Sequence, residues 1–140
     1  MRIALGSDHA GYELKEKIKE VLRERNIGFQ DFGPFSEESV DYPDFGHKVG
    51  ESVDKAEFDR GITICGSGNG INMTVNKYKN VRAALCWTKE ICELARQHND
   101  ANVLSIPARF ISEELALEIV STYIDTDFEG GRHERRVNKI

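Results

Sequence analysis

A cysteine followed by a glycine-rich stretch is the part of this sequence best suited to chemistry. Cys65 ends the short apolar run at residues 62–64 and precedes Gly66, Ser67, Gly68, Asn69 and Gly70, with three glycines in five residues. Such a run lets backbone N–H groups turn toward one point. A helix that begins there favours anions and lowers the pKa of a thiol, which is about 8.5 in a free cysteine. The stretch predicts a reactive thiol beside an anion-binding loop.

The same residues also fit a purely structural interpretation. A buried cysteine packs like a small hydrophobic residue, and glycines occur in many tight turns. The run does not match the dinucleotide-binding pattern, because its third glycine follows the second by two positions rather than three. The motif alone therefore leaves a catalytic cysteine and a packed cysteine as open alternatives.

Three further groups of polar side chains lie where a ligand site could form: Asp8 with His9, His98 with Asn99, and Arg132 with Arg136. Each has an ordinary explanation, since an aspartate can cap a helix, histidines occur in loops and a basic tail is usually solvated. Taken together with the glycine loop, they supply proton-transfer groups and cations for a phosphate. That combination suits a sugar phosphate as the ligand.

Apolar runs alternate with amphipathic segments along the chain. The runs predict five strands, at residues 3–5, 27–32, 62–64, 81–87 and 103–106. Helical spacing predicts helices at about 12–26 and 44–55, one that begins in or just after the glycine run, one at 88–95, and one from Ser112 to about 124. In the first helix Leu14, Ile18 and Leu22 share an apolar face, and Lys15 lies off it with the other charges.

Most of the predicted strands are short continuous apolar runs, which are typical of a parallel sheet covered on both faces. We therefore predict a single-domain, three-layer αβα fold with a Rossmann-like, doubly wound, five-stranded parallel sheet. Ligands bind such sheets at the carboxyl ends of the strands, near the point where the strand order reverses. The loops that carry Asp8 and Cys65 both follow a strand in this way.

Composition limits the possible classes of function. The 140 residues suit one domain, and the net charge of -5 argues against general nucleic-acid binding. Three cysteines, with spacings of 21 and 6, form neither a disulfide framework nor a zinc pattern, and we interpret Cys86 and Cys92 as packing residues. The amino terminus lacks the apolar core of a signal peptide or membrane span. We expect a cytoplasmic protein without nucleic-acid or membrane partners.

Five motifs along the chain form a specific combination: G-S-D-H-A-G, D-Y-P, C-G-S-G-N-G-I, R-Q-H-N-D-A-N-V-L and E-G-G-R-H-E-R-R-V. Together they resemble the type B ribose-5-phosphate isomerases, whose superfamily includes the subunits of galactose-6-phosphate isomerase. The resemblance spans essentially the whole chain. It implies interconversion of ribose 5-phosphate and ribulose 5-phosphate in the pentose phosphate pathway, without a metal or organic cofactor. It also implies a homodimer with shared sites, or a tetramer, in which the tail at about 126–140 contributes to the site or the interface.

The resemblance also assigns roles to individual residues. Cys65 resembles the base that moves a proton between C2 and C1 through a cis-enediolate, and His98 resembles the proton donor that opens the furanose ring. Substrate-binding positions are matched by Asp8, His9, Tyr42, Gly66, Ser67, Gly68, Asn69, Gly70 and Asn99, and phosphate-binding positions by Arg109, Arg132 and Arg136.

Two features bear on how far these roles transfer. Many relatives have threonine in place of Ser67, which keeps the hydroxyl group. Some branches use a glutamate of the following helix as the base, but that helix reads I-N-M-T-V-N-K here and offers no carboxylate. Two alternatives stay open: an isomerase of six-carbon sugar phosphates, such as allose or galactose 6-phosphate, and a non-catalytic phosphate- or nucleotide-binding module.

Overall fold

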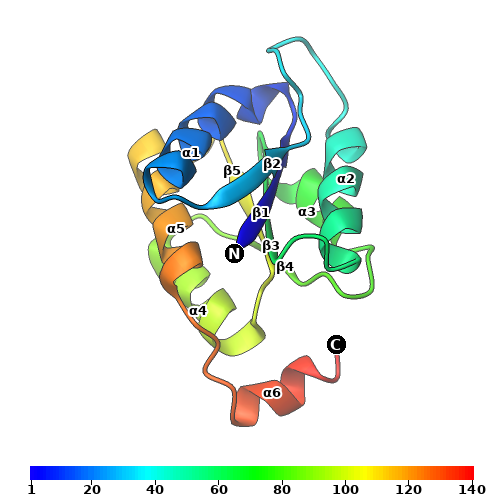
Figure 1. The fold of residues 1–140 in the computed structure, drawn as a ribbon, viewed down its shortest axis with the longest axis vertical. Coiled ribbons are helices and arrows are strands. Elements are labelled where there is room, and N and C mark those ends of the chain that lie inside the picture. The colour runs from blue at the N-terminus through cyan, green and yellow to red at the C-terminus, as the bar shows by residue number, and fades with distance from the viewer.

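Five parallel strands form one sheet in the order β2-β1-β3-β5-β4 (Figure 1). The computed structural model describes all residues, 1–140. Its strands are β1 Arg2–Ser7, β2 Gly28–Asp31, β3 Arg60–Cys65, β4 Ala83–Leu85 and β5 Val103–Pro107. Its helices are α1 Tyr12–Glu24, α2 Tyr42–Asp54, α3 Asn69–Val75, α4 Lys89–Asn99, α5 Glu113–Asp125 and α6 Arg132–Val137, with a short 3-10 turn, η1, at His9–Gly11.

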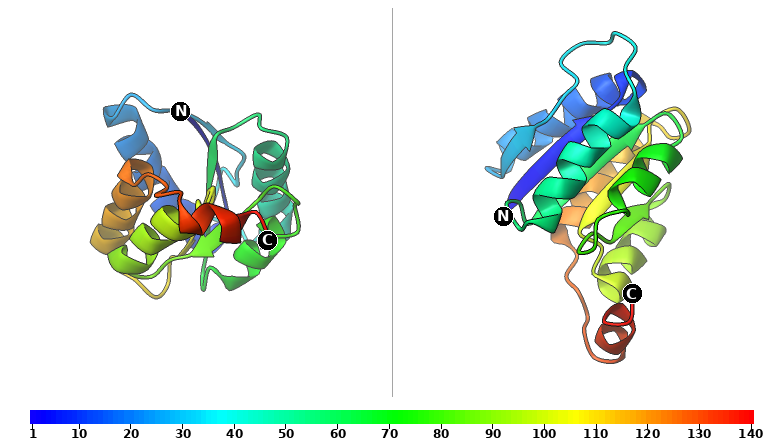
Figure 2. Two further views of the ribbon diagram at one scale, coloured as in Figure 1. Left: turned by 90° about the horizontal axis from the view of Figure 1, so that it is seen from below. Right: turned by 90° about the vertical axis from the view of Figure 1, so that its right-hand side faces the viewer.

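Helices cover both faces of the sheet, and α6 lies beyond the end of α4 (Figures 1 and 2). On one face α1, α4 and α5 pack over Ile3 and Leu5 in the larger core, and on the other α2 and α3 pack over Ala4 in the smaller one. Successive residues of a central strand are therefore buried on opposite faces, which explains its continuous apolar sequence. The predicted three-layer, doubly wound fold is confirmed. No helix has both the length and the apolar character that crossing a membrane requires.

Several element boundaries differ from the predicted ones. α2 begins at Tyr42, and β4 is only three residues long. α4 runs on to Asn99, so His98 and Asn99 lie in its last turn and not in the loop before β5. Arg96 explains the extension, because this buried side chain donates to the Ala101 carbonyl at 2.7 Å and to the Asp100 carboxylate at 2.9 Å. Asp100 then ends the helix in the left-handed conformation, at φ 47°.

Lys15 departs from the predicted amphipathic pattern of α1, because its side chain is fully buried. Its Nζ donates to the two carboxylate oxygens of Asp31 at 2.6 and 2.8 Å and to the Pro34 carbonyl at 2.7 Å. Burial alone would raise the pKa of Asp31, but hydrogen bonds from Lys15 and Lys19 outweigh it and hold that pKa below its usual value. This ion pair fixes the start of the segment between β2 and α2, whose Val40 N–H donates to His9 Nδ1 at 3.2 Å.

We predict that Lys15→Met destabilises the protein by about 3 kcal/mol, because it removes one of the two cations that pair with the buried Asp31 carboxylate and the donor to the Pro34 carbonyl, leaving only Lys19 on Asp31. Urea unfolding followed by circular dichroism measures the change. Lys17→Met is the matched control, since Lys17 is exposed on the same helix and its loss should change stability by less than about 0.5 kcal/mol. Equal stability of the two variants would contradict the assigned role of the buried pair.

Candidate active site

Asp8 and Cys65 meet where β1 and β3 end side by side. The two strands are paired in parallel, with Ser7 opposite Ile64, and the Asp8 N–H donates to the Ile64 carbonyl at 3.1 Å. From this central pair the chain adds β2 on one side and β5 and β4 on the other, so the strand order reverses here. This is where a doubly wound sheet binds ligands, as the sequence predicted.

The glycine loop turns sharply between β3 and α3. Gly68 is the N-cap of α3 and has φ 73°, in the left-handed region. A Cβ on Gly68 would lie 2.4 Å from Leu85 Cδ1 and 3.1 Å from the backbone nitrogen of Pro107. The Arg109 N–H donates to the Gly66 carbonyl at 3.0 Å, and the Arg109 side chain lies against Gly66. The loop therefore brings an arginine next to the cysteine.

A cavity of about 450 Å³ opens over this loop. Seven of its eight lining residues were predicted site residues: Asp8, Tyr42, Cys65, Gly66, Ser67, Gly70 and Arg109. The Cys65 side chain is largely buried at its base, and the Tyr42 ring lies so close to Gly70 that a Cβ there would be 2.4 Å from Tyr42 Cζ. The fold thus gathers a thiol, a carboxylate, a phenol and a guanidinium in one cavity.

Asp8 and His9 are both held by the backbone. Asp8 Oδ1 accepts the Gly11 N–H at 3.1 Å, so the capping role considered for this residue is realised in η1. His9 Nδ1 accepts the Val40 N–H, which places the proton of a neutral ring on Nε2. His9 does not line the cavity over Cys65, although it follows a residue that does.

Phe110 is the eighth lining residue, and the sequence analysis missed it. Its side chain is 75% exposed, and it lines both the cavity over Cys65 and a neighbouring one of about 250 Å³. That second cavity is lined by Ser67, Asn69, Leu85, Trp87, Pro107 and Phe110. No motif marks Phe110 or Trp87, and the sequence does not show that both side chains are exposed beside the cavities. Exposed aromatic residues beside a polar cavity suit a contact with sugar carbons or with another chain.

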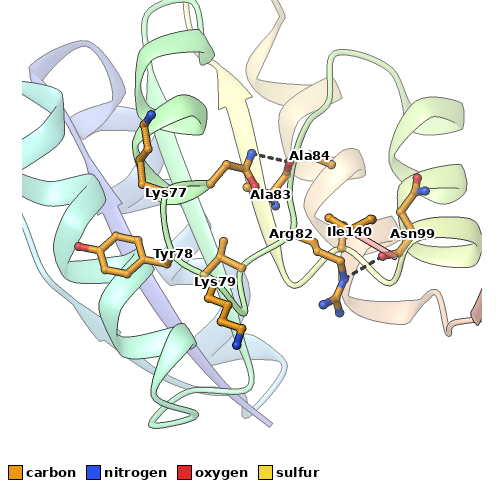
Figure 3. Close-up of a pocket in the computed structure, with 11 residues that line it drawn as sticks. Lys77, Tyr78, Lys79, Arg82, Ala83, Ala84, Asn99 and Ile140 are labelled. Carbon is orange, nitrogen blue, oxygen red and sulfur yellow. Dashed lines mark hydrogen bonds between the residues drawn. The ribbon is translucent and has the colours of Figure 1, made fainter. Parts of the chain in front are cut away.

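The remaining predicted residues, His98, Asn99, Arg132 and Arg136, lie at the other end of the sheet. They belong to the last turn of α4 and to α6, near the amino ends of the strands (Figure 1). Asn99 lines the largest cavity, of about 610 Å³, together with Tyr78, Arg82 and Ile140 (Figure 3). At about 3.3 Å per residue the six residues of β3 span roughly 20 Å, which separates these side chains from Cys65.

Comparison with known proteins identifies the family. Residues 3–140 match the family described as Ribose/Galactose Isomerase. The chain belongs to that family. It is 42% identical over 139 residues to ribose-5-phosphate isomerase B of Escherichia coli, covering 99% of this chain and 93% of the relative. The predicted resemblance is confirmed.

Solved structures of family members share the whole fold. Ribose-5-phosphate isomerase B of Clostridium thermocellum superposes with a TM-score of 0.97 at 49% identity, covering 99% of this chain and 94% of that one. Ribose-5-phosphate isomerase B of Mycoplasma genitalium, solved with bound ribulose-5-phosphate, superposes with a TM-score of 0.94 at 42% identity, covering 99% and 92%.

Gly68→Ala should destabilise the protein by about 2–4 kcal/mol for two reasons. Alanine is strained in the left-handed conformation, and its Cβ would lie too close to the backbone of Pro107. Gly130→Ala is the matched control, because Gly130 has a similar φ of 66° but nothing within 4 Å of an added Cβ. Gly130→Ala should lower the free energy of unfolding only by the backbone strain, about 1 kcal/mol. Urea midpoints measure both, and equal losses would show that the close approach at Gly68 does not constrain the loop.

Proposed function

We propose that this chain interconverts D-ribose 5-phosphate and D-ribulose 5-phosphate, without a metal or organic cofactor. The observation that carries the proposal is its full-length similarity to proteins named ribose-5-phosphate isomerase B, one of them solved with ribulose-5-phosphate bound. The contents of the cavity over Cys65 support it, because an aldose–ketose isomerase needs one carbon base and hydrogen-bond donors for two oxygens.

Cys65 is the proposed base. In the open-chain aldose, its thiolate removes the proton on C2 and returns it to C1. A cis-enediolate forms between the two steps, and the proton of the C2 hydroxyl passes from O2 to O1. Backbone N–H groups of residues 66–70 are suited to stabilise the charge that develops on the enediolate oxygen. Cys86 and Cys92 are buried at 1% and 0% exposure, away from the cavity. The neighbouring Cys92 thiol, and then burial, raise the pKa of Cys86 far above its usual range, so Cys86 stays protonated.

The phosphate is proposed to bind the arginines. Arg109 lies in the cavity beside Gly66, whereas Arg132 and Arg136 are exposed on α6 and lie four residues apart. Residues at this spacing share one face of a helix, so both guanidinium groups can donate to the oxygens of one phosphate.

One chain cannot assemble all of these groups, because His98 and α6 lie a strand length away from Cys65. Proton transfer requires heavy atoms within about 3 Å, or one bridging water. We infer a homodimer in which the α4–α6 end of one subunit meets the Cys65 end of the other, so that His98 of one chain opens the ring of a sugar held by its partner. Isologous packing repeats the arrangement at a second, identical site.

Cys65→Ala should reduce conversion of ribose 5-phosphate by about a thousandfold, within the range for loss of a general base or acid, while substrate binding stays within a few fold. The assay measures formation of ribulose 5-phosphate in the presence of a chelator. A second readout is exchange of the C1 hydrogen of ribulose 5-phosphate in D₂O. Because O5 of that sugar is esterified, it stays open-chain, so exchange reports the carbon base without ring opening.

Cys86→Ala is the control, and it should retain both activities per folded molecule. Undiminished turnover of Cys65→Ala would contradict the proposed base. If the parent protein turns over allose or galactose 6-phosphate and not ribose 5-phosphate, the six-carbon alternative, which the family description includes, replaces the proposal. Tight nucleotide binding without any isomerase activity would favour the binding module.

Mixing Cys65→Ala chains with Arg132→Ala chains, by co-refolding, should restore activity to about a quarter of the parent value, because random pairing makes half the dimers mixed and each has one intact site. The control mixes Arg132→Ala with His98→Asn. These two residues belong to the same half-site, so both sites of a mixed dimer stay defective. Activity in the control mixture, or none in the first, would argue against shared sites.

A further inference from the structure

α6 buries a single side chain, and that side chain is a histidine. His133 is 6% exposed, whereas Arg132, Glu134, Arg135 and Arg136 are all exposed. The His133 ring stacks on the His98 ring, with centroids 4.1 Å apart and planes at 11°. The proposed ring-opening residue therefore has a flat partner on one face, supplied by a segment more than thirty residues away in the sequence.

Glu129 holds the histidine in place. Its Oε2 lies 3.4 Å from His133 Nε2. Its backbone N–H donates to the carbonyl of Gln97, the residue before His98, at 3.0 Å, and the His133 N–H donates to the Gly130 carbonyl at 3.1 Å. Residues 129–133 therefore contact the last turn of α4 at both ends. Glu129 bonds to Gln97, and the His133 ring stacks on His98.

A cation site is the first interpretation that these three side chains invite, because one donor atom from each lies within 4.8 Å of the others. The stacking argues against it. Lone pairs of imidazole nitrogens lie in the ring plane, and two nearly parallel planes do not converge on one ion as tetrahedral zinc ligands must. The geometry is that of one ring lying flat on another.

We propose that His133, held by Glu129, is a positioning residue for His98. An imidazole turns about a broad, roughly two-fold torsion, so a partly buried histidine such as His98 can still sample several ring orientations. The His133 ring on one face of His98 limits that motion. It thereby orients the His98 nitrogen that must reach the ring oxygen of the sugar, where a small displacement lowers the rate strongly. This inference rests on the proposed role of His98 in ring opening and adds the residues that orient it.

The charges around His133 fit this role. Glu129, Arg132 and Arg136 face it from its own segment, and His98 faces it from α4. Burial, followed by the charges of His98 and Arg132, lowers the pKa of His133. His133 is therefore neutral near neutral pH, and it does not repel His98 when His98 carries its proton.

The test compares His133→Leu with His133→Phe, because both substitutes fill the space and only phenylalanine keeps a flat face. Turnover of ribose 5-phosphate should fall about tenfold in His133→Leu and less than about threefold in His133→Phe. Exchange of the C1 hydrogen of ribulose 5-phosphate should stay within about twofold in both variants, since it needs no ring opening. Glu129→Ala should lower turnover several-fold in the parent and have no further effect in His133→Phe, because Glu129 acts through the histidine.

Glu134→Ala is the matched control on the exposed side of α6, and it should change neither readout. The positioning role is overturned if leucine and phenylalanine behave alike, or if turnover and exchange fall together, which would indicate a damaged site or interface. His98→Asn separates the two proposals. If that variant keeps full turnover, the ring-opening role fails and the positioning role fails with it. If it loses turnover while His133→Leu does not, only the positioning role fails.

Discussion

The parallel pairing of β1 with β3 is the constraint on which the rest of the molecule depends. It sets the ends of the two strands level, so that the Asp8 N–H can bond to the Ile64 carbonyl and Cys65 follows directly. Because the chain leaves this pair in opposite directions, no third strand covers the crevice above it. The cavity over Cys65 is thus a consequence of strand order, and the glycine loop only shapes its floor.

The same sheet also keeps the two halves of the proposed site apart. A helix that follows a parallel strand must run back to the opposite edge before the next strand can begin. α4 therefore carries His98 and Asn99 toward the amino ends of the strands, while Cys65 stays at the carboxyl end. A local rearrangement cannot bring His98 to Cys65 over a distance set by strand length. For this reason we propose a second copy of the chain, rather than a mobile loop, as the source of the missing residues.

Periodicity and strand character were enough to predict the layers and the sheet, because those features follow from alternating apolar and amphipathic segments. The cavity lining was predicted differently: the glycine motif and the loop after β1 pointed to Cys65 and Asp8, whereas Tyr42 and Arg109 came from the family resemblance alone. The predictions that were wrong concern residues whose positions depend on contacts with distant parts of the chain. The sequence places Lys15 on the surface, but its side chain is buried because Asp31 and Pro34 accept its hydrogen bonds. α4 continues past Ala95 because the Arg96 side chain donates to a buried carbonyl, that of Ala101. α6 reads R-H-E-R-R-V, a polar sequence from which the burial of His133 cannot be inferred.

The tail that carries α6 is held by polar contacts rather than by an apolar core. Arg96 Nε donates to the Thr126 carbonyl at 3.0 Å, and the Glu129 N–H donates to the Gln97 carbonyl. Beyond these, His133 is the only buried side chain of the helix. Segments with few buried apolar contacts open locally at low cost. If the tail packs on a second subunit, assembly orders the arginines that we propose bind the phosphate, and substrate binding in turn strengthens the interface.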